Sequence, residues 1–176
     1  AISYNIFGIS EWSTRLPGVI LTSVSVPLLY LVGRELFAHR SAAVFSALVY
    51  LTLLPVARHG RLAMLDGSLV CFFLLVILCL LRLYRDRNAL LGISLGLTLI
   101  CLTKGIMMGL LLTAIAIIFL SWHSPNILTQ KLFWFAIAFG ISPVIVWYAL
   151  QYFHYGGKFL SVNLVDQTFS RVWVTV

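Results

Sequence analysis

The stretch ALLGISLGLTLICLTKGIMMGLLLTAIAIIFLSW (89–122) holds 34 residues and a single formal charge, on Lys104. Drawn as one helix it would be about 50 Å long, at 1.5 Å per residue. The hydrocarbon core of a bilayer is only about 30 Å thick. The sequence therefore predicts two short helices that meet near 103–105, where Gly105 allows the backbone to turn tightly.

The composition of the whole chain is that of an integral membrane protein. It is 61% hydrophobic and only 10% charged, with a mean hydropathy of +1.04, whereas soluble domains carry about 25% charged residues. The net charge of +7 comes from basic residues scattered between apolar runs, which favours contacts with membrane lipid headgroups. We expect no nucleic-acid partner, because no basic stripe alternates with aromatic residues.

Four further apolar runs bring the expected number of membrane crossings to about six. They lie at residues 16–33, 41–57, 62–81 and 132–153. The fold predicted is an all-α, polytopic transmembrane bundle that forms a single domain over 1–176. Its parts are an interfacial segment at 1–15 (an amphipathic helix or a pre-membrane loop), the transmembrane helices within 16–153, and an external segment at 154–176.

Alternating crossings distribute the polar segments over two faces. One face is expected to hold 34–40, 82–88 and 121–131, and the other 1–15, 58–61, Lys104 and 154–176. Lysine and arginine number six on each face, so their count alone does not set the orientation. The cluster of Arg82, Arg85 and Arg87 favours the cytoplasm for the first face, which leaves the cations of the second face to be explained.

Asp66 stands out in the stretch ARHGRLAMLDGSLVCFF (57–73). With a helix that begins at Leu62, its carboxylate would lie about 6 Å inside the apolar run, where an ionisable group indicates function. Such a carboxylate could bind a divalent metal ion, together with a second acid from elsewhere, or position an attacking group. The alternative is a structural acid in the first helical turn, stabilised by the helix N-terminus and paired with Arg58 or Arg61.

The cations on the same face suggest a phosphate ligand. The guanidinium groups of Arg58 and Arg61 can grip phosphate oxygens in a bidentate way, and Lys104 can bind them as a point charge. The alternative is that these side chains only reach lipid headgroups. Arg171 in the polar tail is a further candidate for substrate binding, and His59 is either a metal ligand or a plain hydrogen-bonding residue.

Together these residues suit a substrate with a lipid tail in the bilayer and a phosphate at its surface. Clustered cations would stabilise the negative charge that develops on a departing phosphate. A divalent metal ion could assist as a Lewis acid.

Several segments resemble one family of membrane enzymes. They are FGISEWSTRLPGVI (7–20), VGRELFAHRSAAVFSALVYLTLL (32–54), ARHGRLAMLDGSLVCFFLL (57–75) and LTKGIMMGLL (102–111), with a looser match at NLVDQTFSRV (163–172). They are similar to the membrane core of the superfamily that contains dolichyl-phosphate-mannose–protein mannosyltransferases and aminoarabinose (lipid A) transferases. These are GT-C glycosyltransferases.

The resemblance implies a donor, a location and roles for two residues. The donor would be a polyprenyl-phosphate sugar, and the acceptor a hydroxyl of a lipid, glycan or protein. The active site would face the periplasm or exterior of a bacterial inner membrane. Asp66 would handle the metal or the acceptor, and Lys104 would lie near the lipid phosphate.

The family's catalytic acid has no counterpart in this sequence. In the family it lies in the first external loop, upstream of the segment matched by RLP (15–17). We therefore expect a chain truncated at both ends, with the main catalytic acid before Ala1, that is inactive by itself. Two other functions stay open, a transporter or flippase for a phosphorylated lipid or anion, and a non-catalytic membrane subunit in which Asp66 only pairs with arginine.

Overall fold

The computed structural model describes residues 3, 8–53, 65–83, 85–123 and 125–156, and within them it contains helices and no strand. The helices are α2 (Glu11–Leu36), α3 (Arg40–Thr52), α5 (Asp66–Arg82), α6 (Ala89–Lys104), α7 (Ile106–His123), α8 (Pro125–Leu128) and α9 (Lys131–Tyr155). The expected all-α fold is confirmed for these residues.

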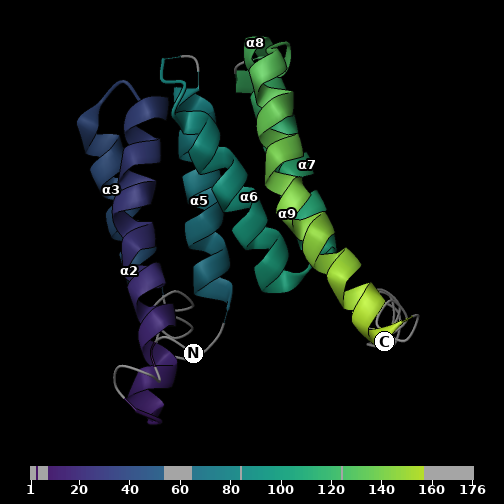
Figure 1. The fold of residues 1–176 in the computed structure, drawn as a ribbon. Coiled ribbons are helices and arrows are strands. Elements are labelled where there is room, and N and C mark those ends of the chain that lie inside the picture. Colours follow the sequence, from purple (N-terminus) through teal and green to yellow (C-terminus); the bar gives the residue numbers. More distant parts are fainter. Residues whose placement is uncertain (1–2, 4–7, 54–64, 84, 124, 157–176) are drawn as a thin grey trace, which may run out of the picture.

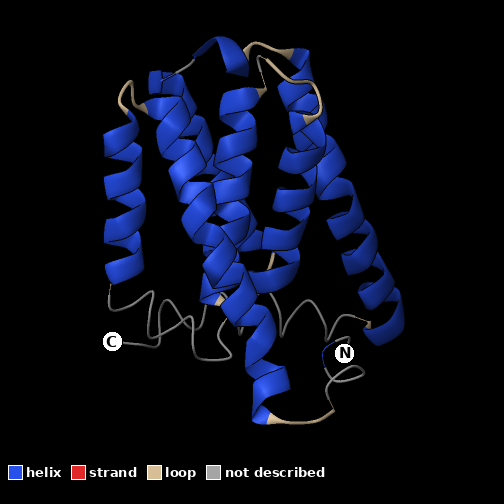
Figure 2. Ribbon diagram, turned by 90° about the vertical axis from the view of Figure 1, so that its left-hand side faces the viewer, coloured by secondary structure: helices blue, strands red, loops and turns tan. Residues whose placement is uncertain are grey.

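The long helices stand side by side and alternate in direction (Figure 1). Helix α2 packs against α3 and α5, α5 packs against α6, and α6 packs against both α7 and α9. One end of the bundle, here called the Asp66 end, holds the start of α5, the end of α6 and the end of α9. The opposite end, here called the Arg82 end, holds the end of α5, the start of α6 and the short helix α8. Figure 2 shows the same bundle of antiparallel helices turned by 90° about the vertical axis.

The predicted break in the stretch 89–122 is confirmed. Helix α6 ends at Lys104, and Gly105 takes φ of 90° before α7 begins at Ile106. A left-handed backbone of this kind is open to glycine and strained for other residues. The Gly105 N–H donates to the carbonyl of Cys101 at 2.9 Å and closes the last turn of α6. One apolar stretch thus becomes two helices that both contact the centre of the bundle.

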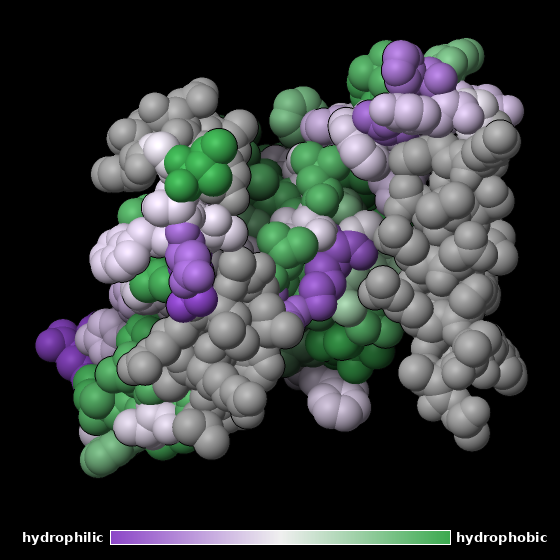
Figure 3. All heavy atoms as spheres, turned by 90° about the horizontal axis from the view of Figure 1, so that it is seen from below, coloured by the Kyte–Doolittle hydropathy of each residue, from purple (hydrophilic) through white to green (hydrophobic). Residues whose placement is uncertain are grey.

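Two helices satisfy the length and hydropathy expected of a membrane span, α2 with 26 residues and α9 with 25. Shorter apolar helices are Arg40–Thr52, Ala89–Lys104 and Ile106–Trp122. Many large apolar side chains on the outside of the bundle face away from it, among them Phe135, Phe139 and Leu150. Figure 3 shows the Asp66 end, where green hydrophobic atoms surround a few purple hydrophilic ones.

The first helix begins earlier than the boundary expected at residue 16. Ser10 and Ser13 form a reciprocal capping box, in which the Ser13 N–H donates to Ser10 Oγ at 3.2 Å and the Ser10 N–H donates to Ser13 Oγ at 3.0 Å. Such a cap satisfies backbone donors that would otherwise lack partners. Residues Glu11–Arg15 therefore belong to the first turns of α2 rather than to a separate interfacial segment.

The core lies between α5, α6, α7 and α9. Its most buried side chains are Leu80, Ile93, Ile100, Leu120 and Phe133. Helices α6 and α9 approach closely where the Thr98 hydroxyl donates to the Gly140 carbonyl at 2.6 Å. A Cβ added at Gly140 would lie 2.9 Å from the Cα and carbonyl oxygen of Ser94. Backbone atoms cannot rotate away as a side chain can, so this crossing requires a residue without a side chain.

We expect Gly140→Val to lower the free energy of unfolding by about 1–3 kcal/mol, because it overpacks the crossing of α6 and α9. Phe139→Val is the matched control, since Phe139 is the adjacent residue and is exposed; it should change stability by less than about 0.5 kcal/mol. Chemical or thermal unfolding of the purified protein measures both. Equal stability of the two variants would contradict the packing described.

Candidate functional site

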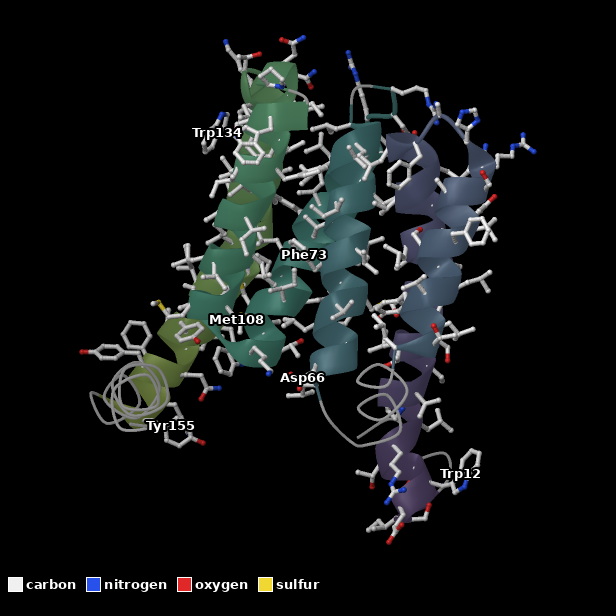
Figure 4. The ribbon with its side chains drawn as sticks, turned by 180° about the vertical axis from the view of Figure 1, so that it is seen from behind. Trp12, Asp66, Phe73, Met108, Trp134 and Tyr155 are labelled. Carbon is white, nitrogen blue, oxygen red and sulfur yellow. The ribbon has the colours of Figure 1, made fainter. Side chains whose placement is uncertain are left out.

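An ion pair between Asp66 and Lys104 marks one end of the bundle (Figure 4 labels Asp66). Asp66 is the first residue of α5 and Lys104 is the last residue of α6. Because α5 and α6 are antiparallel neighbours, the start of one lies beside the end of the other. The Lys104 ammonium donates to Oδ1 of Asp66, although the two residues are 38 positions apart in sequence.

Helix electrostatics favour both charges where they stand. The unpaired N–H groups at the start of α5 stabilise the Asp66 carboxylate, and the unpaired carbonyls at the end of α6 stabilise the Lys104 ammonium. The side chain of Asp66 is 47% exposed and that of Lys104 is 35% exposed. A half-exposed pair of this kind contributes little to stability. Its charges therefore remain accessible to a ligand.

The pair has bonding capacity left over. An ammonium carries three donors and a carboxylate two acceptor oxygens. Among the described residues, the ammonium of Lys104 and the carboxylate of Asp66 bond only to each other. The remaining N–H groups can bind an anion such as a phosphate, and Oδ2 can accept from a hydroxyl. The site thus offers a donor and an acceptor side by side.

An apolar cavity of about 170 Å³ lies between α6, α7 and α9, and neither Asp66 nor Lys104 is among its lining residues. It begins at Cys101 and Ile106, on either side of the Lys104–Gly105 break, and its wall continues through Leu110 and Ile141 to Trp134. Its lining is almost wholly hydrophobic. A molecule with a charged head at Lys104 could therefore place an apolar tail against α7 and α9.

The residue that sequence reasoning missed at this end is Tyr148 of α9. Its hydroxyl oxygen lies 3.7 Å from the place where a Cβ of Gly105 would stand. It thus approaches the helix break that carries Lys104. A tyrosine hydroxyl both donates and accepts, so it adds a polar group to an apolar wall. The sequence does not single out Tyr148 as a site residue, because it lies in a long apolar run (132–153) that contains several other aromatic residues.

The structure corrects the expected position of Asp66. The helix that holds it begins at Asp66 and not at Leu62, so the carboxylate lies at the helix start rather than about 6 Å inside. Preceding it, Leu65 is the N-cap and provides no side-chain cap. A negatively charged side chain in the first turn is stabilised by the partial positive charge of the helix start.

The predicted meeting of Asp66 and Lys104 on one face is confirmed, and Lys104 is the partner of Asp66. The other four candidates, Arg58, His59, Arg61 and Arg171, lie outside the described residues. Their roles in binding phosphate or metal stay predictions.

The described residues do not form a metal site. They contain no group of three or more histidine, cysteine, aspartate or glutamate side chains able to hold an ion. Within the described ranges, Asp66 provides the carboxylate at the site, and Lys104 already neutralises it. A divalent metal at Asp66 would require further ligands from segments beyond the described ranges.

The Arg82 end carries a different ion-pair cluster. The Arg82 Nε donates to Oε1 of Glu35 at 2.7 Å, and the Arg85 guanidinium lies 3.7 Å from the same oxygen. The Asp86 carboxylate accepts from the Asn88 N–H at 2.9 Å. Glu35 and Asp86 are thus on the face opposite Asp66, as the alternating topology predicted, and Glu35 ties the end of α2 to the end of α5.

Comparisons with known proteins find both relatives and a matching family model. Curated relatives are named undecaprenyl phosphate-alpha-4-amino-4-deoxy-L-arabinose arabinosyl transferases. The chain is 29% identical to one from Proteus mirabilis over 82% of this chain and 26% of the relative, and 29% identical to one from Pseudomonas fluorescens over 83% and 26%. One from Yersinia enterocolitica is 33% identical over 42% of this chain and 15% of its own length.

The chain thus spans about a quarter of the length of the first two relatives. No solved structure matches it significantly. The family model described as dolichyl-phosphate-mannose-protein mannosyltransferase matches residues 1–148, which include both Asp66 and Lys104. This chain belongs to the dolichyl-phosphate-mannose-protein mannosyltransferase family.

Proposed function

We propose that this protein transfers a sugar from a polyprenyl-phosphate donor to an acceptor hydroxyl on the external side of a membrane. The observation that carries the proposal is the Asp66–Lys104 pair at one end of the bundle, together with an apolar cavity whose lining includes Cys101 and Ile106 on either side of the helix break that carries Lys104. This combination fits a ligand with a phosphate head and a hydrocarbon tail. Membership of the family and the names of the relatives support the same class of donor.

The proposed reaction is a displacement at the anomeric carbon of the sugar. The acceptor oxygen forms a bond to that carbon, the bond from the carbon to the phosphate oxygen breaks, and polyprenyl phosphate leaves. Lys104 donates to a phosphate oxygen and offsets the negative charge that grows on the leaving group. Asp66, released from Lys104 by the phosphate, accepts from the acceptor hydroxyl and orients it. The proton passes to a carboxylate base that is not among the described residues.

Arg58, Arg61 and Arg171 belong to the proposal as additional phosphate contacts from segments outside the described residues. A divalent metal ion is also part of the proposal. Asp66 would bind it together with His59 or other ligands, and the ion pair between Asp66 and Lys104 would have to break. Held there, such an ion would supply Lewis acidity toward the phosphate.

We further propose that the six long helices of the described chain cross a bacterial inner membrane. Helices α2 and α9 are long enough for a span, and the shorter ones would cross where the bilayer adapts to them. The Arg82 end would face the cytoplasm, because Arg82 at the end of α5 and Arg85 and Arg87 just after it cluster there. The Asp66 end would then face the periplasm, where the transfer would occur.

The orientation can be measured with variants that each add one cysteine and with a membrane-impermeant thiol reagent. We expect Asp86→Cys at the Arg82 end to react only after the membrane is opened. Tyr155→Cys, at an exposed position at the other end of the bundle, should react in intact cells. The parent protein is the background control, since its described cysteines are buried or half-buried. Labelling with the reverse pattern would reject the proposed orientation.

We expect Asp66→Asn and Lys104→Met in the full-length protein to reduce sugar transfer by about 10²-fold or more, because each removes a group that acts on the reacting atoms. The assay supplies a set of polyprenyl-phosphate sugars and follows the labelled sugar into the acceptor fraction. Arg15→Met is the control, since the partner of Arg15 among the described residues is Glu11, on the exposed surface of α2. Full activity of Asp66→Asn would reject its role. Movement of intact donor across the membrane without loss of its sugar would favour a flippase.

Both substitutions should leave the protein folded. The pair is half exposed, so removing either charge should lower the free energy of unfolding by no more than about 1 kcal/mol. Thermal unfolding of the parent, the two single variants and the double variant gives the coupling between the charges. A loss several times larger would indicate that the pair holds α5 and α6 together, and the loss of transfer could then be structural.

A further inference from the structure

The residue after Asp66 forms an unusually close contact with the neighbouring helix. Gly67 lies against Thr22 of α2, and a Cβ added to Gly67 would overlap Thr22 Oγ1 and lie 3.3 Å from Thr22 Cβ. The Thr22 hydroxyl donates to the Gly18 carbonyl at 2.8 Å, which fixes its orientation. Helix α5 can therefore approach α2 this closely only because position 67 has no side chain.

This contact lies one residue from the carboxylate that pairs with Lys104. Asp66 is on the first turn of α5, so any displacement of that turn moves the carboxylate relative to the end of α6. Lys104 ends α6, which packs against α9 as well as against α5 and stops at Gly105. The separation of the two charged groups therefore depends in part on how closely the first turn of α5 rests on α2.

We propose that Gly67 and Thr22 are positioning residues that set the place of the Asp66 carboxylate relative to Lys104. The inference rests on the proposed transferase function. Neither residue needs to touch the substrate. Displacement of an acting group by about 1 Å can cost about 10²-fold in rate, so an added methyl group at this contact would affect transfer more than it affects folding.

A second contact of the same kind provides a matched control. Gly92 of α6 lies against Cys79 of α5, where an added Cβ would overlap Cys79 Sγ and lie 3.4 Å from Cys79 Cβ. This contact is near the Arg82 end, away from Asp66. The two glycines thus face similar obstruction from one side chain of an adjacent helix, but only Gly67 adjoins the site.

The test compares Gly67→Ala, Gly92→Ala and the double variant Gly67→Ala/Thr22→Ala in the full-length protein. Transfer kinetics and thermal unfolding are measured for each. We expect Gly67→Ala to lower kcat by about tenfold or more, with KM for the donor changed less than about twofold. Gly92→Ala should keep at least about half of the parental kcat. Removing the Thr22 hydroxyl and methyl groups in the double variant should restore most of the lost kcat.

Three results would overturn the positioning role. They are a parental kcat for Gly67→Ala, an equal loss of kcat in Gly92→Ala, and no recovery in the double variant. Should Gly67→Ala fail to fold, Thr22→Ala becomes the test variant. Ser23→Ala is then its control, because Ser23 is the adjacent exposed residue of α2. Equal kcat in these two variants would reject the inference. Asp66→Asn separates the two proposals, since its full activity rejects the transferase site itself.

Discussion

The fold depends on the need of an apolar chain to satisfy its own backbone. In hydrocarbon surroundings each N–H and C=O must find a partner within the protein, and a helix provides one for nearly all of them. The stretch 89–122 is too long to be a single helix of span length, so it has to break. The break occurs at Gly105, and it leaves the charged Lys104 at a helix end where water or a polar ligand can reach it.

Helix ends are the places where such a bundle can hold charge. The middle of each helix has no spare backbone donors, whereas the first turn lacks partners for its N–H groups and the last turn for its carbonyls. Asp66 and Lys104 occupy one such start and one such end. The start of α5 and the end of α6 therefore each hold one charge, and the antiparallel packing of these two helices brings the charges together.

Much of this arrangement could be predicted from the sequence. The apolar runs predicted the helices, and the excess length of 89–122 predicted the break at 103–105. Alternation of direction placed Asp66 and Lys104 on one face and Glu35 on the other. These predictions succeed because hydrophobic length and chain reversal are local properties of the sequence.

The sequence could not predict which groups touch. A pair with Arg58 or Arg61 was the structural alternative for Asp66, and both arginines lie outside the described residues. The partner that the structure shows, Lys104, comes from the end of another helix and was not predicted as a partner. The start of α5 at Asp66 and the capping box at Ser10 also escaped prediction. Both depend on local backbone geometry, which a hydropathy pattern does not reveal. Tyr148 was missed because only the packing of α9 on α6 brings its hydroxyl near Gly105.

Contacts toward both ends of α5 hold it against α2 and, with the packing of α5 on α6, set the position of Asp66. At the Arg82 end, Glu35 accepts from Arg82, which fixes the end of α5 to the end of α2. Toward the Asp66 end, the absence of a side chain at Gly67 lets α5 rest on Thr22. A helix held at two points cannot slide or tilt freely. The carboxylate therefore meets Lys104 at a position set by packing rather than by the weak attraction of a half-exposed pair.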